Sequence, residues 1–402
     1  MTMPTTSRHV GTALLAAAGL LSLAAAMGIG RFALTPVLPL MLREGFLDVA
    51  QGGWLAAANY AGYLAGALTA SRVPVRAGTL AVVALIATAA LTGAMASPWQ
   101  VLWLPLRFLA GAASAWVFVA TSVWCLGALA RRGEAGASGW VYAGVGAGIA
   151  LAGMHSLVAS AAGVSSQPLW LQLAGLALVL ALPVFWVIAR LGSDDGASRS
   201  AGAADAPPVA DVNGRGIVVC YGFMGFGYIL PTTFLPVLAR GVVDDPRLSG
   251  LAWPVFGATA ALSTLLAARL LQGATRLRTW AGCQLLMGIG VLLPALWSNA
   301  WTIAASALLV GGTFMIITLA GVQEMRARAA SPADAASRVG RITAAFALGQ
   351  IAGPVVSSLL LRLGPDGLAL ALATGAFSLV ATSAWLWRAT SPSILSRELT
   401  HG

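Results

Sequence analysis

The sequence repeatedly runs for about 20 mostly apolar residues, the length that an α-helix needs to cross the roughly 30 Å hydrocarbon layer of a membrane. Clusters of arginine, aspartate and proline separate these runs. We count twelve of them, with approximate limits 11–42, 50–71, 77–96, 99–130, 136–162, 168–189, 215–240, 249–272, 279–297, 301–326, 335–361 and 367–388. Backbone groups in lipid must bond internally, and the runs lack the period-two alternation of barrel strands. Each run is therefore expected to be a helix.

Composition supports the same conclusion. Of the 402 residues, 58% are hydrophobic and only 9% are charged, whereas a soluble domain has roughly 25% charged residues. The connections between the runs are too short to form folded domains. The predicted fold class is an all-α integral membrane protein with twelve transmembrane helices.

The formal net charge of +10 is explained by topology, and we expect no nucleic-acid partner. All 23 basic residues are arginine. Most lie in the two tails or in the even-numbered connections, for example Arg131 and Arg132, and few lie in the odd-numbered ones, for example Arg43. This distribution follows the positive-inside rule and places both termini in the cytoplasm.

The chain divides into two similar halves. Residues 191–214 are rich in Gly, Ala, Ser, Pro and Asp, and we interpret them as a flexible cytoplasmic linker between six-helix bundles at 1–190 and 215–402, the latter ending in a short cytoplasmic tail. "MGIGRFALTPVLPLMLR" in the first half resembles "MGFGYILPTTFLPVLAR" in the second. At an offset of 197, identical residues align at Met27, Gly28, Gly30, Leu38, Pro39 and Arg43, and again at Gly53 in the next helix. Internal repeats of this kind are common in secondary transporters, whose substrate site lies between the halves.

Two arginines, Arg31 and Arg107, fall inside the apolar runs. A charge at the centre of a membrane helix costs roughly 2.5–3.5 kcal/mol on insertion scales, so it usually faces a cavity or a partner. Except for Glu324, the acidic residues lie in connections, tails, the linker or helix ends, which leaves no carboxylate at the depth of either arginine. An organic carboxylate could accept a bidentate pair of hydrogen bonds from a guanidinium. The alternative is that these arginines bond to backbone carbonyls or extend to the external interface.

Four more polar residues are candidates for the same site. Asn59 and Tyr63 are four apart in "NYAGYLAG" and share a helix face. Tyr228 occupies the position of Arg31 in the second half, and Gln350 is an amide in the middle of a helix. Asn59 and Tyr63 could instead form interhelical hydrogen bonds, and Gln350 could bond the backbone that Pro354 leaves free.

His155 and Glu324 are the candidates for proton coupling, because intramembrane carboxylates and histidines commonly carry protons. His155 could instead be a polar residue near the external interface. Glu324 could instead pair with Arg326, Arg328 or Arg341 at the cytoplasmic surface. No metal site or cofactor is expected, and the chain has no phosphate-binding loop for ATP hydrolysis.

Two six-helix halves joined by a cytoplasmic linker resemble the major facilitator superfamily, over almost the whole length. Within it, "GIGRFALTPVLPLM" followed by "NYAGYLAGAL" is similar to the YbfB/YjiJ-type bacterial transporters, and "RFLAGAASA" from Arg107 is similar to the fourth-helix pattern of the superfamily. The resemblance implies a multi-pass protein of the bacterial inner membrane. It also implies alternating access about a central site, with the monomer as the functional unit.

The sequence departs from the superfamily at two places. The connection "GALTASRVPVRAG" lacks the acidic residue of the usual loop between helices 2 and 3. In "YAGVGAGIALAG", Gly148 is followed by Ile149, where drug–proton antiporters have Gly-Pro. The second departure weakens a drug-efflux interpretation.

We therefore expect a secondary active transporter, not an enzyme, whose substrate is a small organic anion, with proton coupling left open. The rival within this class is proton-coupled efflux of drugs or lipophilic cations, which normally needs a buried acid. A rival from another class is a polytopic membrane enzyme, but the acid pairs Asp194-Asp195 and Asp244-Asp245 have no second acidic motif nearby. A non-transporting receptor or scaffold on the same fold is the remaining alternative.

Overall fold

Long helices follow one another along the whole described chain, which in this computed structural model comprises residues 10–191, 214–271, 276–364 and 366–389. Its described part contains no strand. The longer helices are α1 (Thr12–Leu23), α2 (Leu34–Arg43), α3 (Val49–Thr69), α4 (Ala77–Ala94), α5 (Trp103–Thr121), α7 (Ser138–Ala161), α8 (Ser166–Leu191), α9 (Gly214–Val242), α11 (Ala252–Leu270), α12 (Arg276–Leu296), α13 (Ala300–Ala327), α14 (Pro332–Leu361) and α15 (Gly367–Ala389). Shorter pieces are the π-helical segments η1 (Ala24–Arg31) and η4 (Ser122–Leu126), the helices α6 (Gly127–Arg131) and α10 (Pro246–Gly250), and the 3-10 turns η2 (Ala70–Arg72), η3 (Gln100–Leu102) and η5 (Ala135–Ala137). The predicted linker lies, except for its first and last residues, outside the described residues.

Within the described residues, 11 spans are long and apolar enough to cross a membrane. The predicted span α3 is not among them, because residues such as Gln51 and Asn59 lower its mean hydropathy. Its 21 residues are still long enough to cross the hydrocarbon layer. It packs between α5 and α14. With α3 included, the spans agree with the predicted twelve-helix fold.

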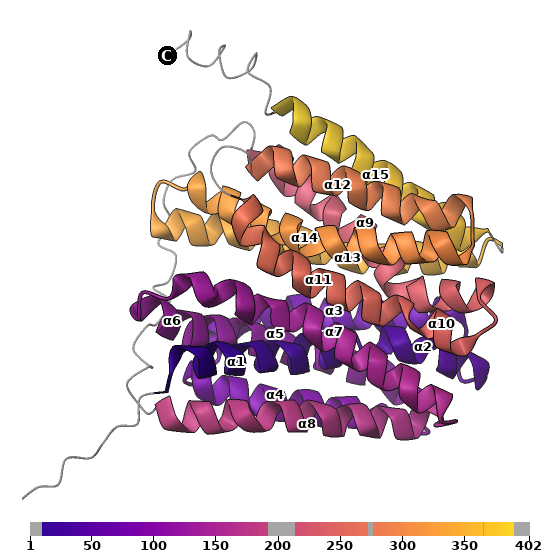
Figure 1. Ribbon diagram of the computed structural model, residues 1–402, viewed down its shortest axis with the longest axis horizontal. Coiled ribbons are helices and arrows are strands. Elements are labelled where there is room, and N and C mark those ends of the chain that lie inside the picture. The colour runs from indigo at the N-terminus through magenta and orange to yellow at the C-terminus, as the bar shows by residue number, and fades with distance from the viewer. Residues whose placement is uncertain (1–9, 192–213, 272–275, 365, 390–402) are drawn as a thin grey trace, which may run out of the picture.

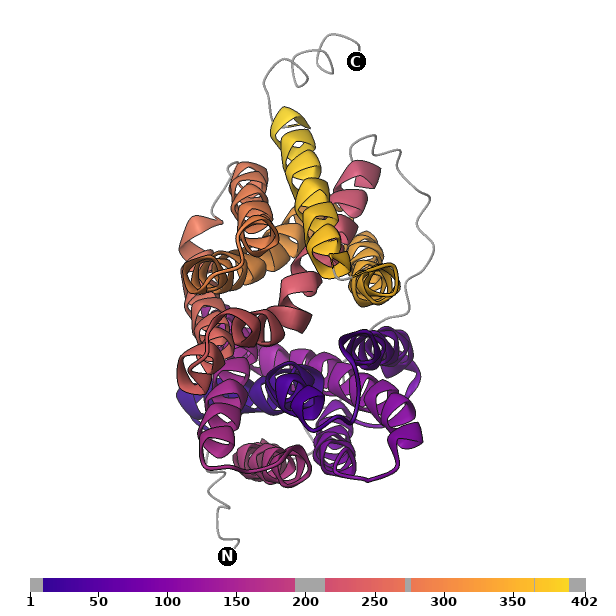
Figure 2. The same ribbon diagram turned by 90° about the vertical axis from the view of Figure 1, so that its right-hand side faces the viewer.

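The helices form two groups that lie against each other. Helices α1 to α8 form the lower group in Figure 1 and α9 to α15 the upper group, and the view in Figure 2 shows the same separation. The first described helix begins and the last one ends at the left of Figure 1. We call this the terminal end of the molecule and the opposite end the far end.

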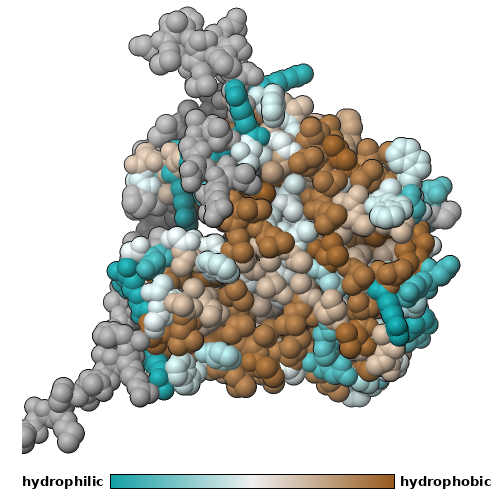
Figure 3. All heavy atoms as spheres, in the orientation of Figure 1, coloured by the Kyte–Doolittle hydropathy of each residue, from teal (hydrophilic) through white to brown (hydrophobic). Residues whose placement is uncertain are grey.

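The outer surface is apolar around its middle. Figure 3 shows brown, hydrophobic side chains across the centre of one face and teal, hydrophilic ones gathered towards both ends. Large apolar side chains that are exposed on individual helices include Val83, Val158, Leu182, Leu262 and Phe377. A soluble protein rarely exposes so large a contiguous apolar surface, whereas lipid tails cover it favourably in a membrane.

The two groups meet around an axis of approximate two-fold symmetry. The hydroxyl of Thr35 donates a hydrogen bond to the carbonyl of Thr232 at 3.0 Å, and these residues are 197 positions apart, the offset of the internal repeat. They are a further identical pair at that offset. A residue touches its own symmetry equivalent only beside the axis that relates the two. Around this axis α3 packs on α14, and α7 packs on α11.

Glycines bring the backbones of α7 and α11 into direct contact. A Cβ added to Gly146 would lie 2.3 Å from the backbone nitrogen of Ala261, and one added to Gly257 would lie 2.3 Å from that of Ala150. Nearer the terminal end, a Cβ on Gly139 would meet the carbonyl of Thr264 only at 3.9 Å. The halves therefore touch most closely in the middle and towards the far end.

We expect the substitution Gly146→Ala to lower the apparent melting temperature of the purified protein, because the new methyl group would overlap the backbone of α11. Overpacking of this kind costs typically about 1–3 kcal/mol. Gly282→Ala is the control, since a Cβ there meets nothing within 4 Å and both changes gain the same helix propensity. Equal melting temperatures for the two variants would contradict the close crossing.

Candidate functional site

The first transmembrane span is interrupted at Arg31. The π-helical segment η1 ends at this residue, and the span resumes as α2 at Leu34. Pro36 has no N–H to donate to the carbonyl of Phe32, which instead accepts from the N–H of Thr35 at 3.1 Å. The carbonyl of Arg31, which would pair with Thr35 in a regular helix, is therefore left without that partner. Such π-helical interruptions frequently occur at functional sites.

Arg107 on α5 satisfies the backbone at this interruption. Its Nη2 donates to the carbonyl of Arg31 at 2.7 Å, and its Nη1 donates to the carbonyl of Gly30 at 3.2 Å. Asn59 on α3 in turn donates to the carbonyl of Arg107 at 2.9 Å. All of these side chains are buried. Arg107 and Asn59 thus make the backbone and interhelical hydrogen bonds that the sequence left open as alternatives.

The guanidinium of Arg31 lies in a cage of aromatic rings. Its Cζ atom is 3.8 Å from the ring centre of Tyr63, 5.3 Å from that of Tyr60 and 5.2 Å from that of Phe32. Only 3% of Arg31 is exposed. Cation–π contacts stabilise a desolvated charge by about 2 kcal/mol, so the rings take over part of the role of water.

Gln350 on α14 connects Arg31 to the second half. Its Oε1 accepts a hydrogen bond from Nη2 of Arg31, and its Nε2 donates to the hydroxyl of Tyr228 on α9. Both Gln350 and Tyr228 are buried. Among the described residues, Nε of Arg31 has no hydrogen-bond partner. The amide oxygen therefore satisfies only one of the two donors along that edge of the guanidinium.

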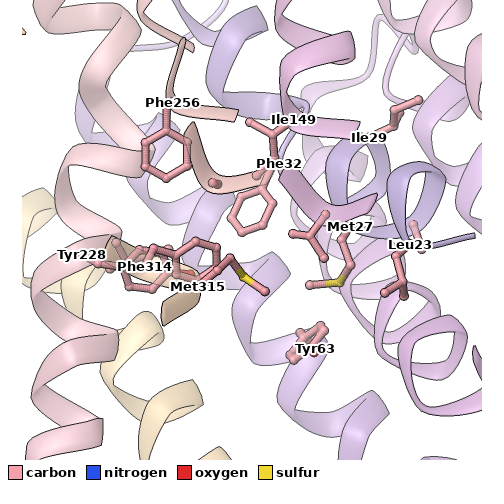
Figure 4. Close-up of a cluster of buried hydrophobic side chains, with 14 of the residues drawn as sticks. Leu23, Met27, Ile29, Phe32, Tyr63, Ile149, Tyr228, Phe256, Phe314 and Met315 are labelled. Carbon is pink, nitrogen blue, oxygen red and sulfur yellow. The ribbon is translucent and has the colours of Figure 1, made fainter. Parts of the chain in front are cut away.

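A stack of three rings forms the opposite wall. Tyr228 lies between Phe314, at 4.8 Å between ring centres and 6° between planes, and Phe346, at 5.5 Å and 12°. In Figure 4, Tyr228 and Phe314 lie on one side, Met27 and Tyr63 lie on the other, and Phe32 is between them. The site is thus one cation and one amide between two aromatic surfaces.

The two proton-coupling candidates lie apart from this cluster. A ring nitrogen of His155 on α7 is 3.0 Å from the amide oxygen of Gln172 on α8, at the partly exposed surface. Glu324 on α13 forms ion pairs with Arg328 at 2.7 Å and with Arg276 at 3.3 Å. The sequence had named Arg328 as a partner for Glu324 but not Arg276.

Comparison with known proteins identifies the family. The family model described as "uncharacterised MFS-type transporter YbfB" matches residues 23–386. The chain belongs to this family. As a YbfB-type member of the major facilitator superfamily (MFS), it is a multi-pass membrane transporter of small molecules and not an enzyme. A search of curated proteins found no match.

Solved structures of other MFS transporters have the same fold. A mutant of the nucleoside transporter NupG aligns with a TM-score of 0.72 and 14% identity, over 93% of this chain and 99% of that one. A bacterial homolog of the human lysosomal transporter Spinster, inward-facing and unoccupied, aligns with a TM-score of 0.65 and 17% identity, over 97% and 96% of the chains. The human organic anion transporter MFSD10 gives 0.62 and 15%, over 96% and 100%. At such low identity the similarity extends to the fold alone.

The structure of this YbfB-type protein adds residues that the sequence pattern did not indicate. Tyr60 and Phe32 complete the cage around Arg31, and Phe314 and Phe346 enclose Tyr228. Tyr60 was open to prediction, because it lies three residues before Tyr63 and residues at that spacing are neighbours on a helix surface. The two phenylalanines come from α13 and α14, and nothing in their local sequence connects them to Tyr228.

We expect Arg107→Met to destabilise the protein by about 1–3 kcal/mol, the cost of leaving buried carbonyl groups unpaired. Adding Pro36→Ala should recover part of this loss. The new N–H at position 36 can donate to Phe32, which frees the N–H of Thr35 for the carbonyl of Arg31. Melting curves of the two single variants and the double variant measure this coupling. If the double variant loses as much stability as the two single variants together, Arg107 does not stabilise the interrupted turn.

Proposed function

We propose that this MFS transporter is a secondary carrier of the bacterial inner membrane, with both termini in the cytoplasm, and that its substrate is a small organic anion. The observation that carries the proposal is the half-satisfied edge of Arg31. Its Nη2 donates to Gln350, while its Nε has no partner among the described residues. These two nitrogens lie on the same edge of the planar guanidinium, which presents donors at the spacing of two carboxylate oxygens.

A carboxylate would satisfy this edge better than the amide does. One oxygen would take the place of Oε1 of Gln350, and the other would accept from Nε. The hydrogen bonds would also be charge-assisted, and such bonds are roughly twice as strong as neutral ones. The described residues place no acidic side chain against Arg31, so the anion would have to come from the ligand.

The surroundings favour a ligand with an apolar body. Tyr60, Tyr63 and Phe32 enclose the cation, and Tyr228 presents its hydroxyl from a stack of aromatic rings. Concave sites with mostly apolar walls and a few placed polar groups are typical of small-molecule binding. We therefore propose an aromatic or aliphatic carboxylate, whose charge lies on Arg31 and whose body lies towards Tyr228.

Replacement of Gln350 by the ligand at Arg31 would couple binding to alternating access. The bond from Arg31 to Gln350 joins the two halves at the level of the site. A ligand that takes over Arg31 releases Gln350 and so weakens this connection, which gives the two conformations different affinities for the ligand. Such a difference is what a ligand needs to shift a conformational equilibrium. Proton coupling through Glu324 or His155 would act from a distance, because neither is hydrogen-bonded to the residues around Arg31.

The proposal predicts that carboxylates stabilise the protein only when Arg31 is present. Purified protein in detergent would be melted with aromatic and aliphatic carboxylates and with lipophilic cations. A ligand at 100 times its dissociation constant stabilises by about 2.7 kcal/mol. Carboxylates should shift the melting temperature of the wild type and of Arg76→Ala, whose arginine is exposed, but not that of Arg31→Ala. Arg31→Lys should bind weakly, since it keeps the charge and loses the two-donor edge.

Melting with lipophilic cations tests the alternative function, the efflux of drugs or lipophilic cations. If they shift the wild type and Arg31→Ala equally while carboxylates shift neither, Arg31 has a structural role and the protein is better described as an exporter of cations or drugs.

A further inference from the structure

The orientation of the Gln350 amide determines how Tyr228 is bonded. An arginine side chain can only donate hydrogen bonds, so the atom of Gln350 that faces Nη2 of Arg31 must be the amide oxygen Oε1. The amide nitrogen Nε2 then faces Tyr228 and donates to its hydroxyl oxygen. Because the hydroxyl accepts this bond, its own proton has to find an acceptor elsewhere.

No described residue accepts this proton. Tyr228 is 1% exposed, and the bond from Gln350 is the one hydrogen bond that the described residues make to its hydroxyl. Phe314 and Phe346 stack on the two faces of the ring and hold it in place. Buried polar groups are nearly always paired, so a phenol proton without an acceptor calls for an explanation.

Two unsatisfied donors therefore flank the amide of Gln350. Nε of Arg31 lies on the side of Oε1, and the hydroxyl of Tyr228 lies on the side of Nε2. In the function proposed above, a carboxylate replaces Oε1 and pairs with Nε and Nη2 of Arg31. Both of its oxygens are then used, and the departure of Gln350 leaves Tyr228 with no partner. A buried polar group left unpaired weakens binding, unless the ligand brings a third oxygen.

We propose that the substrate is a carboxylate with an oxygen on the neighbouring carbon, that is, a 2-hydroxy or 2-oxo acid. This inference rests on the proposed function and narrows its substrate class. In such an acid the third oxygen lies beside a carboxylate oxygen, much as Nε2 lies beside Oε1 in the amide of Gln350. It would take the place of Nε2 and accept the proton of Tyr228. An amino group would not serve, because its ammonium charge would be repelled by Arg31.

The ring stack leads from this site towards the accessible surface. Phe346 lies about one turn before Gln350 on α14, nearer the terminal end. It is partly exposed, whereas Tyr228 and Gln350 are buried. The ligand would therefore approach along Phe346, and the space for its three oxygens would be the space that the Gln350 amide vacates.

The test compares ligands that differ by one oxygen, titrated into the full-length protein in detergent. Mandelate and phenylglyoxylate, the 2-hydroxy and 2-oxo derivatives of phenylacetate, are compared with phenylacetate, and lactate is compared with propionate. We expect the 2-oxygen to lower the dissociation constant about 3–10-fold, the effect of one neutral hydrogen bond. 4-Hydroxyphenylacetate, whose hydroxyl is remote from the carboxylate, should show no such gain. One enantiomer of mandelate should bind more tightly, because its hydroxyl has to point at Tyr228.

Matched tyrosine variants decide whether the gain comes from Tyr228. Tyr228→Phe keeps the stacked ring and removes only the hydroxyl, so the gain should disappear. Tyr221→Phe is the control, and there the gain should persist. The hydroxyl of Tyr221 donates to the carbonyl of Thr318 at 3.1 Å, and its ring also packs on Phe346. Ratios of dissociation constants are compared within each variant, because loss of the bond from Gln350 changes the affinity for all carboxylates alike.

The outcomes separate this inference from the function on which it rests. Carboxylates that bind through Arg31 with no preference for the 2-oxygen, or with the same preference in Tyr228→Phe, would overturn the inference and leave the proposed function intact. If no carboxylate binds, or if all bind equally to Arg31→Ala, both are wrong. If Tyr228→Phe does not fold, the wild type decides, and equal dissociation constants for phenylacetate and both enantiomers of mandelate contradict the inference.

Discussion

A positive charge in the middle of a membrane has to be solvated by the protein itself, and the centre of this structure is arranged around such a charge. Arg31 is nearly inaccessible, and water and lipid headgroups cannot reach it. Three aromatic rings and one amide take their place. A guanidinium has five N–H donors; Nη2 of Arg31 donates to Gln350, and Nε has no hydrogen-bond partner among the described residues. The proposed preference for an anionic ligand rests on this missing hydrogen bond.

Residues that are identical in the two repeats pack the helices together, whereas residues that differ between the repeats supply the polar groups of the candidate site. Gly28 lies against the backbone of Gly148, and its equivalent Gly225 lies against that of Phe346. The equivalent residues Thr35 and Thr232 meet at the symmetry axis. The pair Arg31 and Tyr228, which also occupy equivalent positions, breaks this symmetry, because the first half has an arginine where the second has a tyrosine. Two similar bundles thus form one asymmetric site, with a cation on one wall and a hydroxyl on the other.

The fold could be predicted from the sequence because helix limits in a membrane depend on local properties. The apolar run at 367–388, for example, corresponds to α15 at Gly367–Ala389. The break in the first span was not predicted from the sequence. It depends on two residues: Pro36, which lacks an N–H to donate, and Arg107, which bonds the carbonyl of Arg31. Arg107 lies 76 residues from Arg31 and becomes its neighbour only through packing. The bond between Arg31 and Gln350 spans 319 residues, and no local pattern could specify it.

The most direct test of this account is an experimental structure with a carboxylate that stabilises the protein. We predict that one carboxylate oxygen accepts from Nη2 of Arg31, at the position that Oε1 of Gln350 has in this structure, and that the other accepts from Nε. Gln350 should have moved away from Arg31. A ligand bound elsewhere, with the bond between Arg31 and Gln350 intact, would contradict the account.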